Sequence, residues 1–403
     1  MVTLRKVKED IYYIGGSDYR LDLFENLFPI EHGVSYNSYL ICDEKTCVLD
    51  TVDRSVQDVF LEQLEAGLQG RSLDYLVVNH LEPDHSFCIF DLIQKYPNVT
   101  VVLNKLSNAM LQKFMAKPIN YNVMIVNEND VLDLGKHKLS FITAPMVHWP
   151  EVMVTYDSVD KILFSADAFG TFGGLAGNIF SDEITVDEQF YKEARRYYTN
   201  IVGKYGTNVR GLLKKAGTID IQMLCPLHGP IWRQNFSEFI HRYDLWSRYE
   251  AEDRDIIIIY ASMYNNTFHA CVNLASMLAN RGITNLKMYD VSKIDVSYLI
   301  AEIFRVKTIV IACPNYNAGI YPKMHNLLTD MKALNVSKKN IAIIENSTWA
   351  PTISKQLHDI LGSMKEMNIL NTEVKIQTVL KDNDEVILTQ MAEEIAKEYF
   401  KSE

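Results

Sequence analysis

The chain has 403 residues, 48% of them hydrophobic and 23% charged, which is ordinary for a globular protein and long enough for two or three domains. Its formal net charge of -11 and the lack of a basic run exclude nucleic acid as an expected partner. The N-terminal residues 1–10 mix charges without an apolar core, and no apolar stretch is long enough for a bilayer, so neither a secretory signal nor membrane attachment is expected.

Short apolar segments bounded by Gly, Asp, Asn or Pro follow one another through the first half of the chain. They are rich in β-branched and aromatic residues, and we predict strands over 34–39, 47–52, 75–78, 99–103, 123–126, 139–144, 153–156 and 162–164. Helical patterns cover 55–68, 105–116 and 187–215. These pieces predict two mixed sheets covered by helices.

The pattern changes after the segment 237–255, which is predicted to be a helix leading into a linker. Five apolar strands then alternate with helices, over 256–260, 286–289, 308–312, 341–344 and 374–379. Continuous apolar strands between helices indicate a parallel sheet buried on both faces, hence a doubly wound α/β domain. We therefore divide the chain into domains 1–252 and 253–403.

The cysteines are spaced as in a protein of a reduced compartment. There are six of them, they form no Cys-x-x-Cys pair, and several lie inside apolar runs. A soluble, cytoplasmic protein is expected, without a four-cysteine metal module.

Four potential metal ligands fall within six residues, in the segment His80-Leu81-Glu82-Pro83-Asp84-His85, directly after the strand-like 75–78. Alternate residues of an extended segment project to one side, which brings His80, Glu82 and Asp84 together. Carboxylates held this close repel unless a cation neutralises them. The segment therefore predicts half of a two-metal site.

Three later residues, His148, Asp167 and His228, each lie at or just beyond the end of a predicted strand. A single His or Asp in such a place is more often an ordinary hydrogen-bonded polar group than a ligand. Together with the six-residue segment, however, they supply four histidines and three carboxylates. That set is sufficient for two metals that share one carboxylate and keep open positions for a substrate.

Three loops of the second domain carry the features of a cofactor site. The loop 260–267 places hydroxyl and amide side chains at the start of a helix, as a phosphate cradle or as a plain helix cap. Two further loops follow the third and fourth strands at the same sheet edge, and Tyr316 and Trp349 could flank a flat ring. The candidate contacts are Ser262, Met263, Tyr264, Asn265, Asn266, Thr267, Pro314, Asn315, Tyr316, Asn317, Ala318, Gly319, Ser347, Thr348, Trp349 and Ala350.

The His-x-Glu-x-Asp-His segment with its three later ligands resembles the metallo-β-lactamase fold as flavodiiron proteins use it, and the three loops resemble flavodoxin. The resemblance implies an N-terminal αβ/βα sandwich followed by a flavodoxin-like five-stranded parallel sheet that binds FMN. Zinc hydrolases of this fold have His where this chain has Glu82, and a hard carboxylate favours iron. The resemblance implies one iron on His80, Glu82 and His148, a second on Asp84, His85 and His228, and Asp167 as the bridge.

The same resemblance implies reduction of O2 to water or of NO to N2O, with FMN as the immediate electron donor. It also implies a head-to-tail homodimer or homotetramer, and a separate rubredoxin or flavin reductase as electron source. His32 and Tyr197 match positions that line the gas pocket in the family. The loop residues Asn265, Glu345 and Asn346 depart from the glycine and serine usual in flavodoxins.

Three other functions remain open from the residues alone. The first is a zinc-dependent hydrolase with an accessory flavodoxin domain, against which Glu82 argues. The second is an FMN electron carrier with an inactive first domain, against which the full set of seven ligand types argues. The third is a gas sensor with the same sites and slow turnover.

Overall fold

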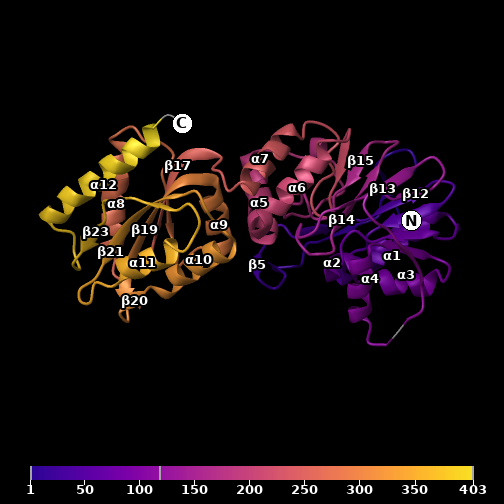
Figure 1. Ribbon diagram of the computed structural model, residues 1–403, viewed down its shortest axis with the longest axis horizontal. Coiled ribbons are helices and arrows are strands. Elements are labelled where there is room, and N and C mark those ends of the chain that lie inside the picture. Colours follow the sequence, from indigo (N-terminus) through magenta and orange to yellow (C-terminus); the bar gives the residue numbers. More distant parts are fainter. Residues whose placement is uncertain (1, 118, 402–403) are drawn as a thin grey trace. The chain divides into compact units, whose positions relative to one another are not determined.

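The computed structural model describes residues 2–117 and 119–401, and the chain forms two compact units, Met1–Asp244 and Leu245–Glu403 (Figure 1). The division falls within helix α7 (Ser237–Ser247). The sequence-based domain limit, after residue 252, lies at the start of strand β17 (Asp253–Tyr260).

The first unit contains two mixed sheets, as predicted. One has the order β1 (Arg5–Lys6), β2 (Ile11–Tyr13), β7 (Tyr39–Cys42), β8 (Thr46–Leu49), β9 (Tyr75–Val77), β10 (Thr100–Leu103) and β11 (Asn122–Ile125). The other has the order β12 (Val131–Asp133), β13 (Lys138–Thr143), β14 (Met153–Asp157), β15 (Ile162–Phe164) and β16 (Met223–Cys225). Buried side chains from both sheets, including Tyr39, Val77, Phe141 and Phe164, form one hydrophobic core.

Helices flank these sheets, with α1, α3 and α4 gathered on one side in Figure 1 and α5 and α6 on the other. Their bounds are α1 (Gln57–Leu68), α2 (Pro83–Ser86), α3 (Ile89–Lys95), α4 (Lys105–Leu111), α5 (Glu188–Tyr197) and α6 (Gly206–Ala216). Two short ribbons pair β3 (Gly16–Asp18) with β6 (Val34–Tyr36) and β4 (Leu23–Phe24) with β5 (Phe28–Pro29). The strands β1 to β5, of two or three residues each, were not predicted because such short segments leave no periodic pattern.

Two predicted elements are interrupted. The helix predicted over 187–215 is divided between α5 and α6 by a π-helical turn, Tyr198–Val202, and a 3-10 turn, Gly203–Tyr205. Glycines at 203 and 206 weaken a continuous helix at that point. The strand predicted over 34–39 is split into β6 and β7 because Asn37 turns to the loop around His228: its Nδ2 donates to the carbonyls of Pro226 and Gly229, at 2.8 Å each.

The second unit has the parallel sheet that was predicted, in the order β18-β17-β19-β21-β23. The remaining bounds are β18 (Lys287–Asp290), β19 (Val306–Tyr316), β21 (Asn340–Asn346) and β23 (Val374–Ile376), with two added short strands, β20 (Gly319–Ile320) and β22 (Asn368–Ile369). Helices α8 (Asn266–Ala279) and α12 (Asp382–Phe400) cover one face, and α9 (Val296–Arg305), α10 (Pro322–Ala333) and α11 (Ile353–Leu361) cover the other (Figure 1). The expected doubly wound fold is therefore confirmed.

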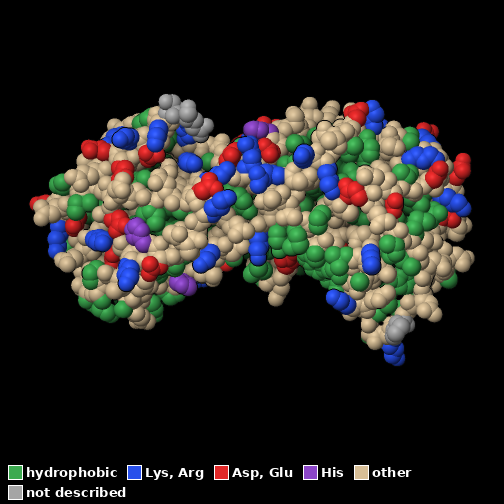
Figure 2. Space-filling model, in the orientation of Figure 1, with side chains coloured by type: hydrophobic (Ala, Val, Ile, Leu, Met, Phe, Trp, Pro, Cys, Tyr) green, Lys and Arg blue, Asp and Glu red, His purple; other side chains and the backbone are tan. Residues whose placement is uncertain are grey.

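Acidic and basic side chains are interspersed over the face of each unit shown in Figure 2. Within residues 2–117 and 119–401, no helix has both the length and the apolar character needed to cross a membrane.

Lys339, which directly precedes β21, allows this fold to be tested by the pH dependence of its stability. Its side chain is buried, Nζ donates to the carbonyls of Phe304 and Val306 at 3.0 and 2.7 Å, and burial lowers the pKa of the ammonium to about 7. The unfolded chain, whose lysines keep their ordinary pKa near 10.4, then binds more protons between pH 7 and 10, so this residue makes stability rise with pH in that window. We expect the free energy of unfolding, measured with denaturant, to be higher at pH 9 than at pH 7 in the wild type. This difference should be smaller in Lys339→Met. Equal gains in the two proteins would contradict the assignment.

Candidate metal centre and cofactor cavity

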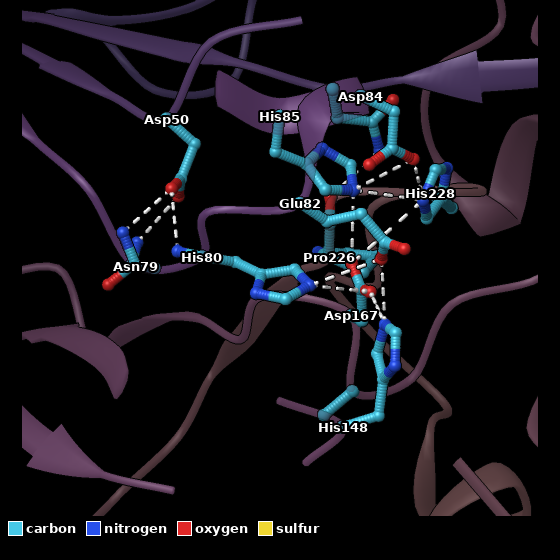
Figure 3. A network of polar contacts seen from close by, with 12 residues as sticks. Asp50, Asn79, His80, Glu82, Asp84, His85, His148, Asp167, Pro226 and His228 are labelled. Carbon is cyan, nitrogen blue, oxygen red and sulfur yellow. Dashed lines mark hydrogen bonds and ion pairs between the residues drawn. The ribbon is translucent and has the colours of Figure 1, made fainter. Parts of the chain in front are cut away.

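The six-residue ligand segment begins shortly after β9 and ends within α2. Pro83 is the first residue of α2, a position where its fixed φ suits a helix and its missing N–H costs nothing. Asp84 and His85 follow within the first turn of this helix, while His80 and Glu82 precede it. The change from strand to helix thus turns all four side chains toward one point (Figure 3).

Asp50 fastens the start of this segment. Its buried carboxylate accepts hydrogen bonds from the backbone N–H and Nδ2 of Asn79, at 2.7 Å each, and from the backbone N–H of His80 at 3.2 Å (Figure 3). Burial raises the pKa of Asp50 to about 6. Sequence reasoning missed this residue, since an Asp after an apolar strand gives no sign of which loop it will contact.

The three later ligands arrive from the second sheet. His148 lies in the connection between β13 and β14, Asp167 follows β15, and His228 follows β16. All seven predicted side chains meet, in two groups whose ligand atoms lie within 4.8 Å of one another. The groups are His80, Glu82, His148 and Asp167, and Asp84, His85 and His228.

Asp167 divides its two carboxylate oxygens between these groups. Oδ2 lies 3.0 Å from His148 Nε2 and 3.5 Å from His80 Nε2. Oδ1 lies 3.1 Å from His85 Nε2 and 3.9 Å from His228 Nε2. A carboxylate placed in this way can serve two cations at once.

The other ring nitrogens of two histidines are held by fixed acceptors. His80 Nδ1 donates to Glu151 Oε1 at 3.0 Å, and His228 Nδ1 donates to the backbone carbonyl of Ser35 at 2.7 Å. Hydrogen bonds of this kind orient the rings, so that Nε2 faces the cluster and can present its lone pair to a metal that displaces a proton. Glu151 was not singled out from the sequence, because it is separated from His80 by 71 positions.

The electrostatics of the cluster favour positive charge. Although burial alone would lower it, the neighbouring carboxylates of Asp167 and Glu82 raise the pKa of His148 to about 9. Burial also opposes charge on Asp167, but His85 and His80 hold the pKa of that carboxyl well below its usual range. Protons on the histidines thus occupy the place that metal cations take when they bind.

The donor set passes a direct test for metals. Both oxygens of Asp84 and Oδ1 of Asp167 are buried without a hydrogen-bond donor among the described residues. The Nε2 atoms of His85 and His228 face each other at 3.0 Å, and at most one of two neutral rings could donate there. Cations between these groups would satisfy all of them, so the residues present fit two metal ions.

Aromatic rings surround the ligands on several sides. The ring centroid of Trp149 lies 5.3 Å from that of His80, and the ring of Tyr197 lies 5.4 Å from that of His228. Tyr197 is fully buried, and its hydroxyl has no hydrogen-bond partner in the described part of the chain. His32 is exposed, and its backbone carbonyl accepts a hydrogen bond from Gly174. A role of Tyr197 and His32 in a gas pocket stays a prediction.

The contact between Glu151 and His80 supplies a test of the metal centre. Glu151→Gln keeps the shape of the side chain but removes the charge that makes the His80 ring a stronger base. Changes of this kind cost about 10- to 100-fold in metal affinity. We expect about tenfold weaker metal retention during dialysis against a chelator, measured as metal per chain. Glu183→Gln, which alters a carboxylate paired with Arg5 elsewhere in this unit, is the control; unchanged retention in Glu151→Gln would contradict the role.

The second unit contains a cavity of about 250 Å³ at the carboxyl edge of its sheet. Ten of the sixteen predicted contacts line it: Ser262, Met263, Tyr264, Asn266, Thr267, Pro314, Asn315, Ser347, Thr348 and Trp349. Asn346 and Thr378 line it as well. All three predicted loops therefore reach one cavity.

The six other predicted contacts are absent from the lining. Tyr316, the last residue of β19, pairs with Gly319, the first residue of β20. Asn317 and Ala318 between them form a two-residue turn at positive φ of 48° and 57°. This hairpin directs residues 316–319 away from the lining. Asn265, at φ 66°, adopts the left-handed conformation expected of an Asn in place of Gly, and Ala350 accepts a hydrogen bond from Asn315.

The unusual Glu345 has a structural explanation. Its buried carboxylate accepts hydrogen bonds from the backbone N–H groups of Ile353 and Ser354, at 3.1 and 3.2 Å, at the start of α11. A negative charge is stabilised at a helix N-terminus. Glu345 therefore holds α11 and does not line the cavity, whereas its neighbour Asn346 does.

The cavity fits a phosphate-bearing aromatic cofactor. It opens at the N-terminus of α8, where Ser262 and Thr267 contribute hydroxyl groups and Ser262 Oγ accepts a hydrogen bond from the backbone N–H of Phe268 at 3.2 Å. Asn315 Oδ1 is buried without a hydrogen-bond partner among the described residues. Trp349, 65% exposed, stands at the rim as an apolar surface for a flat ring.

Comparisons with known proteins identify relatives of this chain. Residues 34–229 match the model of a family described as ODP family beta lactamase. An anaerobic nitric oxide reductase flavorubredoxin of Vibrio vulnificus is 31% identical over 357 residues, which are 87% of this chain and 72% of the relative. An uncharacterized protein of Methanocaldococcus jannaschii is 29% identical over 89% of each chain.

Solved structures extend the similarity to the whole chain. Rubredoxin:oxygen oxidoreductase from Desulfovibrio gigas superimposes with a TM-score of 0.90 and 27% identity, over 98% of both chains. The flavodiiron protein from Giardia intestinalis has the same fold, with a TM-score of 0.90 and 24% identity over 99% of both chains.

Proposed function

Because the chain belongs to the flavodiiron protein family and is an oxidoreductase, we propose that it reduces O2 to water or NO to N2O at two non-haem irons supplied with electrons by FMN. The observation that carries the proposal is the division of the Asp167 oxygens between two complete ligand groups. A protein that held one metal would have no use for the second group.

The metal site is composed for redox-active iron. Two irons bound there would supply redox chemistry toward a small gas molecule. His80, Glu82 and His148 would hold one iron, Asp84, His85 and His228 the other, and Asp167 would hold their spacing. Glu82 Oε2, 2.9 Å from His148 Nε2 and 3.3 Å from His80 Nε2, contributes a hard anionic oxygen, which favours iron.

The chain's own groups orient the ligands and cover part of their edges. The rings of Trp149 and Tyr197 exclude water from the histidine edges they cover, while Glu151 and the carbonyl of Ser35 orient the rings of His80 and His228. A small apolar gas can enter such surroundings more readily than charged solutes can.

The cavity of the second unit would hold FMN, which supplies electrons one or two at a time. Ser262, Thr267 and the start of α8 would bind the phosphate, and Trp349 would pack against the flavin ring. Within this proposal, residues 1–252 form the diiron domain and residues 253–403 the flavin domain.

Two findings count against two of the three alternatives, the hydrolase and the electron carrier with an inactive first domain. The relatives with a stated activity are a nitric oxide reductase and an oxygen oxidoreductase, which favours reduction over hydrolysis. An inactive first domain would not be expected to keep all seven ligands in register.

We propose the electron source and the assembly from the similarity to the family. The names of the two relatives associate them with rubredoxin, and we assign a separate rubredoxin or flavin reductase as donor to this chain. A head-to-tail homodimer or homotetramer in the cytoplasm would bring one subunit's flavin to the other's irons. Loss of turnover on dilution to monomers, at constant iron and FMN content, tests this assembly.

The reaction itself is tested by rapid mixing. Protein loaded with iron and FMN is reduced anaerobically and mixed separately with O2 and with NO, while flavin absorbance and the remaining gas are recorded. We expect the flavin to be reoxidised by at least one gas within the turnover time, with water or N2O as product. The control is the same protein with FMN but without metal, whose flavin should react slowly with NO. Flavin that stays reduced with both gases would refute the proposal.

A further inference from the structure

A third group of potential ligands lies outside the seven residues of the diiron site. Asp10 directly precedes β2 of the first sheet, His137 directly precedes β13 of the second, and Asp160 lies in the turn between β14 and β15. One ligand atom from each lies within 4.8 Å of the other two. The three residues therefore bring together turns that belong to the two sheets of the first unit.

His137 is oriented as metal-binding histidines are. Its ring is fully buried, and Nδ1 donates to Oδ2 of the buried Asp157 at 2.7 Å. A carboxylate on one ring nitrogen fixes the tautomer and leaves the other nitrogen as the ligand. Asp157 thus acts as a positioning residue for His137 Nε2.

The other ring nitrogen faces the acidic group. His137 Nε2 lies 3.1 Å from Asp10 Oδ1, an ion-pair distance when the ring is protonated, and neither atom makes a hydrogen bond in the part of the chain the structure describes. A buried polar atom left in this state costs free energy. A cation among the three residues would satisfy both atoms.

The surrounding charges leave room for a cation. Lys136 Nζ contacts the other oxygen of Asp10, Oδ2, at 2.9 Å, so Oδ1 is not taken by the lysine. Asp160 and Asp157 add two more carboxylates beside the single imidazole.

We propose that Asp10, His137 and Asp160 bind one divalent first-row transition-metal ion such as Zn²⁺, separate from the two irons. One imidazole and two carboxylates are ordinary ligands of Zn²⁺, and solvent would complete the coordination. The ion would tie the turn between β1 and β2 to the two turns of the second sheet. We assign the ion a structural role, since it would hold these three turns together.

The test uses the full chain with its iron and FMN loaded. The protein is dialysed against rising free Zn²⁺, and zinc, iron and FMN per chain are measured together with the thermal unfolding midpoint. We expect one zinc per chain with no loss of iron, and a midpoint that rises with zinc concentration. Asp160→Asn should bind this zinc at least about tenfold more weakly and lose the rise in midpoint.

Asp133→Asn is the matched control, because it neutralises an exposed carboxylate of the adjacent strand β12 that pairs with Lys138 outside the group. It should bind zinc as the wild type does. If His137 instead acts only as a protonated bridge between Asp10 and Asp157, the wild type and Asp160→Asn will take up the same zinc. That result, or zinc uptake matched by iron loss, would overturn the proposal.

Discussion

Asp167→Asn is expected to reduce the rate of gas reduction by about 100-fold or more, because the side chain that faces both ligand groups loses its charge. The amide keeps the size of the carboxylate but presents an NH2 group to one of the two sets of histidines. In the wild type both oxygens face imidazole nitrogens, at 3.0 Å from His148 and 3.1 Å from His85. One metal position should therefore lose its shared ligand, and iron content should fall from two toward one per chain.

The measurement combines iron per chain with O2 and NO consumption under a fixed supply of reduced flavin. Asp182→Asn, in a carboxylate that pairs with Arg233 at the surface of the same unit, should keep both iron and rate. Full iron content with unchanged rate in Asp167→Asn would show that the two oxygens do not serve two metals. Retained FMN in both variants would show that the flavin domain is intact.

Arg305→Met is expected to lower the free energy of unfolding of the second unit by about 3–5 kcal/mol, the usual cost of removing one partner from a buried ionic group. The guanidinium, 6% exposed, lies 2.9 Å from the buried carboxylate of Glu302, 2.7 Å from Asp253 and 2.6 Å from Asp255. Methionine fills the space but leaves Asp253 and Asp255 without this cation and Glu302 with Lys287, whose Nζ lies 3.4 Å away.

Denaturant unfolding of the FMN-loaded protein, followed by flavin fluorescence, reports on this unit. Arg281→Met is the control, because Arg281 pairs with the exposed Glu393 at 3.3 Å and an exposed pair contributes less than about 1 kcal/mol. If Arg305→Met lowers the free energy of unfolding no more than Arg281→Met does, the buried carboxylates take up protons or water at little cost.

The ligand set of the metal centre could be predicted because four of its members are neighbours in sequence. The pattern of His80 to His85 can be recognised without knowledge of the fold. Residues at the ends of later predicted strands are then the candidates for the remaining ligands. The residues that support the ligands have no such pattern. Asp50 and Glu151 are distant from His80 in sequence, and their roles appear only once the sheets are assembled.

The residues that line the cavity of the second unit differ from the predicted contact segments, for a local reason. The loop 313–319 was treated as a single contact segment, but Asn317-Ala318-Gly319 is turn chemistry that closes a hairpin. Thr378, which lines the cavity, comes from a segment after β23 whose polar residues gave no separate sign. The parallel sheet itself was predictable since each strand is apolar throughout.

Ser35 and Asn37, which lie in β6 and between β6 and β7, hold the loop that carries His228. Asn37 Nδ2 holds the carbonyls of Pro226 and Gly229, and the Ser35 carbonyl accepts from His228 Nδ1. Metal occupancy and the cohesion of the two sheets are therefore thermodynamically linked: pulling the sheets apart would remove a ligand, and bound iron would resist that separation. A metal bound at this site would then stabilise the fold of the first unit as well as take part in the reaction.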